Sequence, residues 1–267
     1  MKALCIHIIL LLIFCSACTE DLEIESIQSE PMIVIEGLIT NESPPYKILI
    51  HESKSFNDEL TINPVSDAEV YIRSGDLEEK AVLTEAGTYI VENITGEVNA
   101  SYTIRVVHQD SIYEASSTMI EVPPIDSVLL LQSPDSDTEK PEYNVSVFFG
   151  RKKTTECFYH LELIVNDTII SSFTDDRNYQ VFTDYYMNTI REYIFPYNFK
   201  PGDNVRIKLY SLTSEMFEYL FTLNYQSYQY FDYIHVFPKN LPLFFSSEAL
   251  GYFQVSAVNG IAITIPE

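Results

Sequence analysis

Strict alternation of apolar and other residues runs through most of this chain, and it limits the fold more than any other feature. The segments 46–51, 68–73, 102–106 and 205–209 each place apolar side chains at every second position. A period of two puts successive side chains on opposite faces of a strand, so such a segment has one face to bury. The chain is therefore predicted to be mainly β.

Residues 31–122 contain about seven segments of this kind, which predicts an Ig-like or transthyretin-like β-sandwich. Val122–Pro124 closes the region, because two successive prolines fix φ and remove two main-chain donors from a sheet. We therefore expect a domain boundary at 122/123. The expected strands are 32–39, 46–51, 68–73, 81–84, 88–92, 102–106 and 112–122.

Residues 123–267 are predicted to form a second β-rich domain with one helix. Expected strands lie at 127–132, 143–149 and 157–165, and again after the turn that contains Pro201 and Gly202. The helix is expected over about 214–232. Thr213 can cap it, Glu215 lies in its first turn, and its apolar residues lie near one stripe.

The N-terminus has the pattern of a lipoprotein signal peptide, with Lys2, an apolar stretch over 3–14 and cleavage between Ala17 and Cys18. The apolar stretch is too short to span a bilayer as a helix. After cleavage Cys18 carries lipid on its thiol and an acyl group on its amine, and two such signals give stable anchoring. An uncleaved anchor and an ordinary secretory signal with an incidental cysteine are the alternatives.

The segment 18–30 is expected to be an acidic tether. Its start, Thr19–Glu25, resembles the export tag of surface-exposed lipoproteins in Bacteroidota, which implies an outer-membrane protein that faces the cell exterior; a solvated leader is the alternative. Signal-peptide removal and lipidation of Cys18 leave Cys157 as the remaining thiol, which we expect to be buried and inert. The formal net charge of −23 argues against nucleic acid as a partner.

Several segments together look like a Bacteroidota lipoprotein family known as domain of unknown function 4249. They are 31–40, 64–72, 113–119 with 122–126, 199–203 with 209–212, and 249–253. The chain departs from the family pattern at Ser246–Glu248, where relatives tend to carry a glycine-rich turn. The resemblance implies a surface lipoprotein encoded beside a TonB-dependent outer-membrane transporter. No catalytic residues are established for the family, so none are transferred.

The sequence offers no recognisable catalytic or metal-binding pattern. Its histidines are scattered, and its eight glycines form no phosphate-binding loop. The acidic pairs at 135/137 and 175/176 can be read as calcium ligands, but incidental acidic loops are favoured. We therefore expect no cofactor, no metal and no enzyme; a secreted hydrolase is the least favoured reading.

Tyrosines gather near the predicted helix and suggest a binding surface at Tyr225, Tyr228, Tyr230 and Tyr233. Tyrosine combines a flat apolar face with a hydroxyl, which suits sugar stacking or a protein interface. Filling of the core around the helix is the favoured alternative. Ser111, Ser127 and Thr168 each follow an aspartate and precede an aliphatic residue, which resembles the O-glycosylation acceptor of exported Bacteroidota proteins.

The leading functional expectation is a non-catalytic, lipid-anchored surface protein that assists a TonB-dependent transporter in capturing or delivering its substrate. The alternative is an adhesive or structural surface module, either fimbria-associated or matrix-binding. A sandwich fold hosts both kinds of function, so the fold alone does not choose between them.

Overall fold

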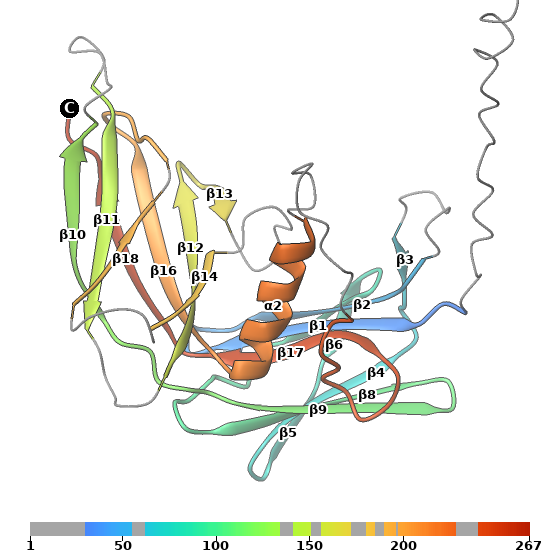
Figure 1. Cartoon of the computed structure of the whole chain (residues 1–267). Coiled ribbons are helices and arrows are strands. Elements are labelled where there is room, and N and C mark those ends of the chain that lie inside the picture. Colours follow the sequence, from blue (N-terminus) through green and yellow to red (C-terminus); the bar gives the residue numbers. More distant parts are fainter. Residues whose placement is uncertain are drawn as a thin grey trace, which may run out of the picture. The chain divides into compact units, whose positions relative to one another are not determined.

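The computed structural model describes residues 30–54, 62–133, 141–150, 156–171, 180–184, 190–195, 197–227 and 240–267. Within these ranges the chain is mainly β with a single α-helix, α2 (Ser214–Ser227). Figure 1 shows the sheets that its strands form. The prediction of a mainly β fold with one helix is confirmed. Met32–Ser53 and Thr61–Glu267 belong to one compact unit.

The N-terminal strands form two sheets. Their bounds are β1 (Ile33–Thr40), β2 (Tyr46–Glu52), β3 (Asn63–Pro64), β4 (Glu69–Ser74), β5 (Leu77–Lys80), β6 (Val82–Glu85), β7 (Thr88–Val91), β8 (Ser101–His108), β9 (Ser111–Thr118) and, from the C-terminal part of the chain, β17 (Leu250–Ser256). One sheet has the order β17-β1-β2-β7-β6, with β3 paired to β2, and the other has the order β5-β4-β8-β9.

Side chains from both sheets meet in one apolar core, so the two sheets form a sandwich. Ile35 and Ile48 come from the first sheet, and Val70 and Ile104 come from the second; all four are fully buried. Ile48, Val70 and Ile104 occupy positions that the alternation predicted to face inward. Burial of such apolar faces is the main source of stability in a sandwich.

β17 joins the first sheet from the far end of the sequence and runs parallel to β1. In the register of this pair, Gly251 lies opposite Ile35. Gly251 has a φ of 95°, and a Cβ at this position would lie 2.0 Å from the Ile35 carbonyl oxygen. The close approach of the two strands therefore requires glycine here. The sequence analysis placed this segment in the second domain, whereas its partner strand lies within 31–122.

The remaining strands form two further sheets around a second core. Their bounds are β10 (Ile125–Gln132), β11 (Tyr143–Gly150), β12 (Phe158–Val165), β13 (Thr168–Ser171), β14 (Gln180–Thr183), β15 (Ile190–Ile194), β16 (Asn204–Leu212) and β18 (Val258–Thr264). One sheet has the order β10-β11-β15, and the other has the order β13-β12-β16-β18, with β14 paired to β12. Val147 of β11 and Leu161 of β12 are fully buried in this core.

The helix α2 begins at Ser214, where the capping pattern predicted it. The Thr213 hydroxyl oxygen accepts the main-chain N–H of Met216 at 3.2 Å, which satisfies one of the unpaired donors of the first turn. Met216 and Leu220, one turn apart, pack with Tyr252 of β17 in a third apolar cluster. The predicted end of the helix near residue 232 lies outside the described residues.

The strand expected over 112–122 is shorter in the structure, where β9 ends at Thr118. Beyond it the Met119 N–H donates to the Ala100 carbonyl at 3.0 Å. Ile120 then forms an isolated parallel bridge with Ser256 of β17. After Thr118 the chain therefore leaves the second sheet, and at Ile120 it pairs with β17, the edge strand of the first sheet.

Candidate binding groove

A groove of about 430 Å³ lies where the end of β9, the start of α2 and the strand β17 come together. The segment 242–244, which precedes β17, completes its wall. Residues that are far apart in the sequence thus share one concave surface. We call this surface the groove and treat it as the candidate site, because binding sites are generally concave and of comparable volume.

Hydroxyl groups form part of the groove lining. The Ser101 and Thr118 hydroxyl oxygens are 2.7 Å apart, and either can donate to the other. Such a pair shares one of its two protons, so one donor is left for a ligand. Ser117 instead accepts the main-chain N–H of Val255 at 3.3 Å and so joins β9 to β17. The full set of hydroxyl residues is Ser101, Ser116, Ser117, Thr118 and Thr213.

The lining also contains the apolar residues Ile120, Pro242, Leu243, Phe244 and Phe253. Leu243 is 63% exposed and Ile120 is 39% exposed, so both offer apolar surface to a ligand. Glu215 supplies the carboxylate of the lining. It lies in the first turn of α2, where the helix dipole favours a negative charge. The groove therefore combines hydrogen-bonding, apolar and anionic contacts.

A second, smaller hollow of about 220 Å³ is lined by Ser214 of α2 and by Cys157 and Phe158. Ile120 borders both hollows. Cys157 is half-buried rather than buried, so the expectation of a buried thiol is wrong in this respect. Cys157 lies directly before β12, outside the strand whose alternate side chains are buried.

A buried polar network fixes Ile120 between the two hollows. The Ser211 hydroxyl donates to the Ile120 carbonyl at 2.5 Å and accepts the Ala257 N–H at 3.0 Å. The Ser256 hydroxyl donates to the Ser211 carbonyl at 2.6 Å, and the Gln254 side-chain amide donates to the Ser256 hydroxyl at 3.1 Å. Because Ser211, Gln254 and Ser256 are buried, these hydrogen bonds hold β16, β17 and the end of β9 in one arrangement.

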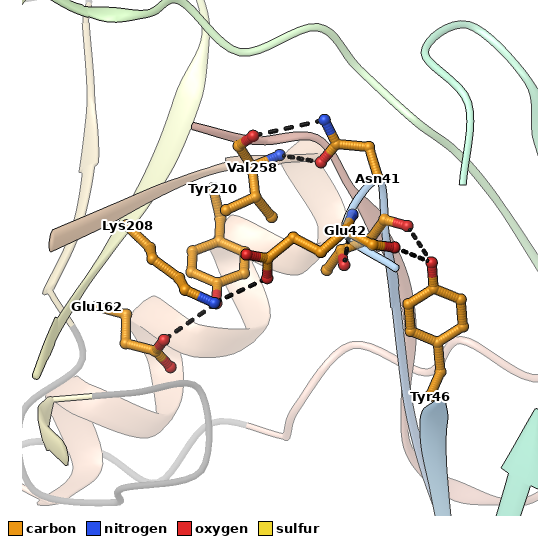
Figure 2. A network of polar contacts seen from close by, with 8 residues as sticks. Asn41, Glu42, Tyr46, Glu162, Lys208, Tyr210 and Val258 are labelled. Carbon is orange, nitrogen blue, oxygen red and sulfur yellow. Dashed lines mark hydrogen bonds and ion pairs between the residues drawn. The ribbon is translucent and has the colours of Figure 1, made fainter. Parts of the chain in front are cut away.

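A further polar cluster joins the turn after β1 to the strands β16 and β18, as Figure 2 shows. The Lys208 ammonium lies 2.8 Å from the Glu42 carboxylate. Asn41 makes two hydrogen bonds with the main chain of Val258: its oxygen accepts the N–H at 2.7 Å and its amide donates to the carbonyl at 3.4 Å. The Tyr46 hydroxyl donates to the Thr40 carbonyl at 2.7 Å.

Burial changes the acidity of two side chains in this cluster. The Tyr210 hydroxyl donates to the Glu162 carboxylate at 3.1 Å (Figure 2). Burial raises the pKa of Glu162 above its usual value, and the hydrogen bond from Tyr210 partly offsets this rise. Burial, together with the charge of Glu162, also raises the pKa of Tyr210, so the phenol stays protonated. The cluster is best described as a structural junction, since its groups mainly bond one another.

Of the sequence-predicted site residues, Ser111, Ser127 and Thr168 have described side chains, and none of these three lines the groove. Ala17 and Cys18 lie outside the described residues, as do Tyr228, Tyr230 and Tyr233. Tyr225 lies in the last turns of α2, and its side chain is not described. The tyrosine surface and the lipidation site therefore stay predictions.

The three O-glycosylation candidates are exposed but far from one another in the topology. Ser111 begins β9 after a two-residue turn, and Ser127 lies in β10 beside a bulge. Thr168 begins β13 after Asn166 and Asp167, both of which have positive φ. Each site is thus accessible, and modification of all three stays a prediction.

Sequence reasoning did not single out the residues of the groove as a site. Two segments that carried the family resemblance contribute to it: Ser116–Thr118 belong to 113–119, and Phe253 belongs to 249–253. The signal that was available is the run of hydroxyl residues at the end of a strand, which is unusual because it interrupts the supply of apolar side chains to a core. The acidic segments 135–137 and 175–176 lie outside the described residues.

Membrane-spanning helices and metal-binding groups of side chains are both absent from the described residues. No helix there is both long and apolar enough to cross a membrane. No group of three or more His, Cys, Asp or Glu side chains in the same ranges is placed to hold a metal ion.

Comparison with known proteins identifies the family. A search of curated proteins found no match. The family model described as Domain of unknown function (DUF4249) matches residues 19–260, which is most of the chain. This range includes every segment that carried the resemblance and every residue of the groove. The chain therefore belongs to the family defined by domain of unknown function DUF4249.

Proposed function

We propose that this chain is a non-catalytic lipoprotein of the cell surface that assists a TonB-dependent outer-membrane transporter in capturing or delivering its substrate. The observation that carries the proposal is the N-terminal pattern, in which a signal peptide ends at Cys18 and an acidic tether follows. A lipid on Cys18 holds the folded part close to proteins of the same membrane, where a partner is met at high effective concentration.

The groove supports a binding role. Its hydroxyl groups are engaged with neighbouring side chains or with the main chain, as with Ser101 and Thr118, or Ser117 and Val255. Hydroxyls held in this way position a ligand, whereas a catalytic nucleophile needs a hydrogen bond to a general base. The apolar residues of the groove add contact area of the kind found at interfaces, and Leu243 among them is largely exposed.

Affinity purification of the lipidated protein from its own cell envelope tests the proposal. We expect an outer-membrane transporter to co-purify with the tagged native protein. The Cys18→Ser variant, which cannot be lipidated there, should lose this co-purification. Recovery of pilus or matrix proteins in place of a transporter would favour the adhesive alternative, and recovery of no transporter under native conditions would count against the proposed function.

A further inference from the structure

We infer that the groove binds an extended polypeptide segment, which adds to the outer edge of β9 through the main-chain groups of Ser116 and Thr118. This inference deepens the proposed function, since it names the kind of partner segment that the groove takes, and it rests on that function only for the source of the segment. An added strand can pair with β9 only where the N–H and carbonyl groups of β9 point away from β8.

The pairing of β8 with β9 fixes these directions. A two-residue turn connects His108 to Ser111, and the register pairs Thr103 with Ser116 and Ser101 with Thr118. Antiparallel partners alternate between pairs that exchange main-chain hydrogen bonds and pairs that do not. Close side-chain contacts are typical of pairs of the second kind, and the hydroxyls of Thr103 and Ser116 are 2.8 Å apart.

Glu114 gives an independent check on the alternation. Its carbonyl accepts the N–H of Ser246 at 2.8 Å, and its own N–H donates to the Ser246 hydroxyl at 3.2 Å. Both groups of Glu114 therefore point away from β8. Positions two apart in a strand point the same way, so the N–H and carbonyl of Ser116 and Thr118 also point outward.

The chain itself shows that this edge accepts main-chain pairing. Ser246 occupies the edge at Glu114, and the Ser247 hydroxyl donates to the Ile112 carbonyl at 2.8 Å. Two and four residues further along the strand, at Ser116 and Thr118, the same edge lines the groove. A strand edge with outward donors and acceptors is a template for an added strand, and this mode of peptide recognition recurs widely.

The lining indicates which side chains the segment carries. Successive side chains of an added strand alternate between its two faces. An apolar residue of the segment meets Ile120 and Leu243, whose exposed surfaces would be covered. A lysine or arginine of the segment suits Glu215, and the net charge of −23 favours approach of a cationic partner.

The test uses the full-length lipidated protein in detergent and a displayed library of random eight-residue peptides. We expect the library to yield binders that combine apolar and cationic residues. A selected peptide should bind at least tenfold more weakly when alternate residues are N-methylated, along the main-chain edge that pairs with β9. A tenfold change in affinity corresponds to about 1.4 kcal/mol.

A pair of variants separates the main chain from the side chain. Ser116→Pro removes the outward N–H, and proline is tolerated at an edge when its nitrogen faces away from the sheet. Ser116→Val removes the same hydroxyl but keeps the N–H. We expect the selected peptide to bind at least tenfold more weakly to the proline variant than to the valine variant, with both variants unfolding cooperatively.

The inference is overturned if the library yields no binder, or if neither N-methylation nor the change from valine to proline weakens binding. Should the proline variant not fold, the N-methylated peptide decides the question alone. Co-purification with the transporter is scored separately on the same two variants. A transporter that follows the proline variant as well as the valine variant would refute the inference and leave the proposed function standing. Peptide binding without co-purification of any transporter would support the inference and count against the proposed function.

Discussion

The surroundings of His160 strongly alter its chemistry. It lies on β12 opposite Tyr210 of β16, and the two ring centroids are 5.6 Å apart. The side chain is fully buried, and this burial lowers the pKa of His160 to about 3 from the usual 6.5. Between about pH 6.5 and 3 the His160 imidazole is therefore neutral in the folded protein, whereas the unfolded chain protonates it.

Stability should fall below pH 6.5 because of His160. Between about pH 6.5 and 3 the unfolded state binds a proton that the folded state does not, so the stabilisation is complete above 6.5 and is lost as the pH falls. We expect this residue to lower the free energy of unfolding by about 1.4 kcal/mol between pH 7.5 and 5.5. Urea unfolding of the native protein and of His160→Leu at both pH values measures it.

The difference between the two proteins isolates the histidine, because Glu162, whose pKa is raised, acts in the opposite direction in both. An equal loss of stability in native protein and His160→Leu would contradict the prediction.

Gly251 and Gly75 provide a matched pair for the cost of a Cβ. Both have positive φ, at 95° and 57°. A Cβ at 251 would lie 2.0 Å from the Ile35 carbonyl oxygen, whereas a Cβ at 75 meets nothing within 4 Å. We expect Gly75→Ala to cost about 1–2 kcal/mol from backbone conformation alone. Gly251→Ala should cost at least about 3 kcal/mol, because β17 must also move from β1. Chemical denaturation of both variants decides it.

Glycosylation of Ser111, Ser127 and Thr168 is a prediction that intact mass can settle. All three residues are exposed, so a transferase could reach them in the folded protein. We expect the natively expressed protein to exceed the mass of peptide plus lipid, and the triple alanine variant to lose the excess. A native mass equal to peptide plus lipid would remove the hypothesis.

Ser211 of β16 connects the segment that follows β9 with the residue between β17 and β18. Its hydroxyl bonds both the Ile120 carbonyl and the Ala257 N–H. Ser211→Ala should cost about 2–3 kcal/mol, because it leaves a buried donor and a partly buried acceptor without this partner. Ser101→Ala is the matched control, since Ser101 is exposed and its change should cost less than about 0.5 kcal/mol. Equal losses in urea unfolding would show that the buried network is unimportant.

Strand interiors could be predicted from the sequence, because a period of two is a local signal. Ile48, Ile104 and Ile207 are buried as the alternation required. The pairing of β17 with β1 could not be predicted, because partners more than 200 residues apart leave no local trace and both strands have apolar residues on either face. The exposed strand β5 was missed for a different reason, since its sequence LEEK lacks an apolar face.

The groove escaped prediction because segments that are far apart in the sequence create it only when the chain is folded. Thr213 and Glu215 were recognised as helix-start residues, and Ser116–Thr118 as part of a family segment. Nothing local indicated that these residues meet. Sequence reasoning instead chose tyrosines, whose clustering is visible along the chain. This preference for local clusters is inherent in reading one sequence without its contacts.

The whole molecule depends on a single attachment point in the proposed function. Cys18 and Cys157 are the cysteines that remain after the predicted cleavage, so Cys157→Ser is a control that removes a thiol without touching the predicted lipidation site. We expect the native protein and Cys157→Ser to partition into the detergent phase with the membrane fraction, because two lipid signals make anchoring stable. Cys18→Ser should move to the aqueous phase, since no lipid then offsets the hydration of a chain with a net charge of −23.

Immunoblotting of both phases and intact mass of the membrane fraction measure this shift. Cys18→Ser that stays in the detergent phase would show that another part of the molecule holds the membrane. In that case the groove could no longer be placed at the cell surface by the tether, and the transporter proposal would lose the observation that carries it. The peptide-binding inference would survive, because its variants act on the edge of β9 whatever the location of the protein.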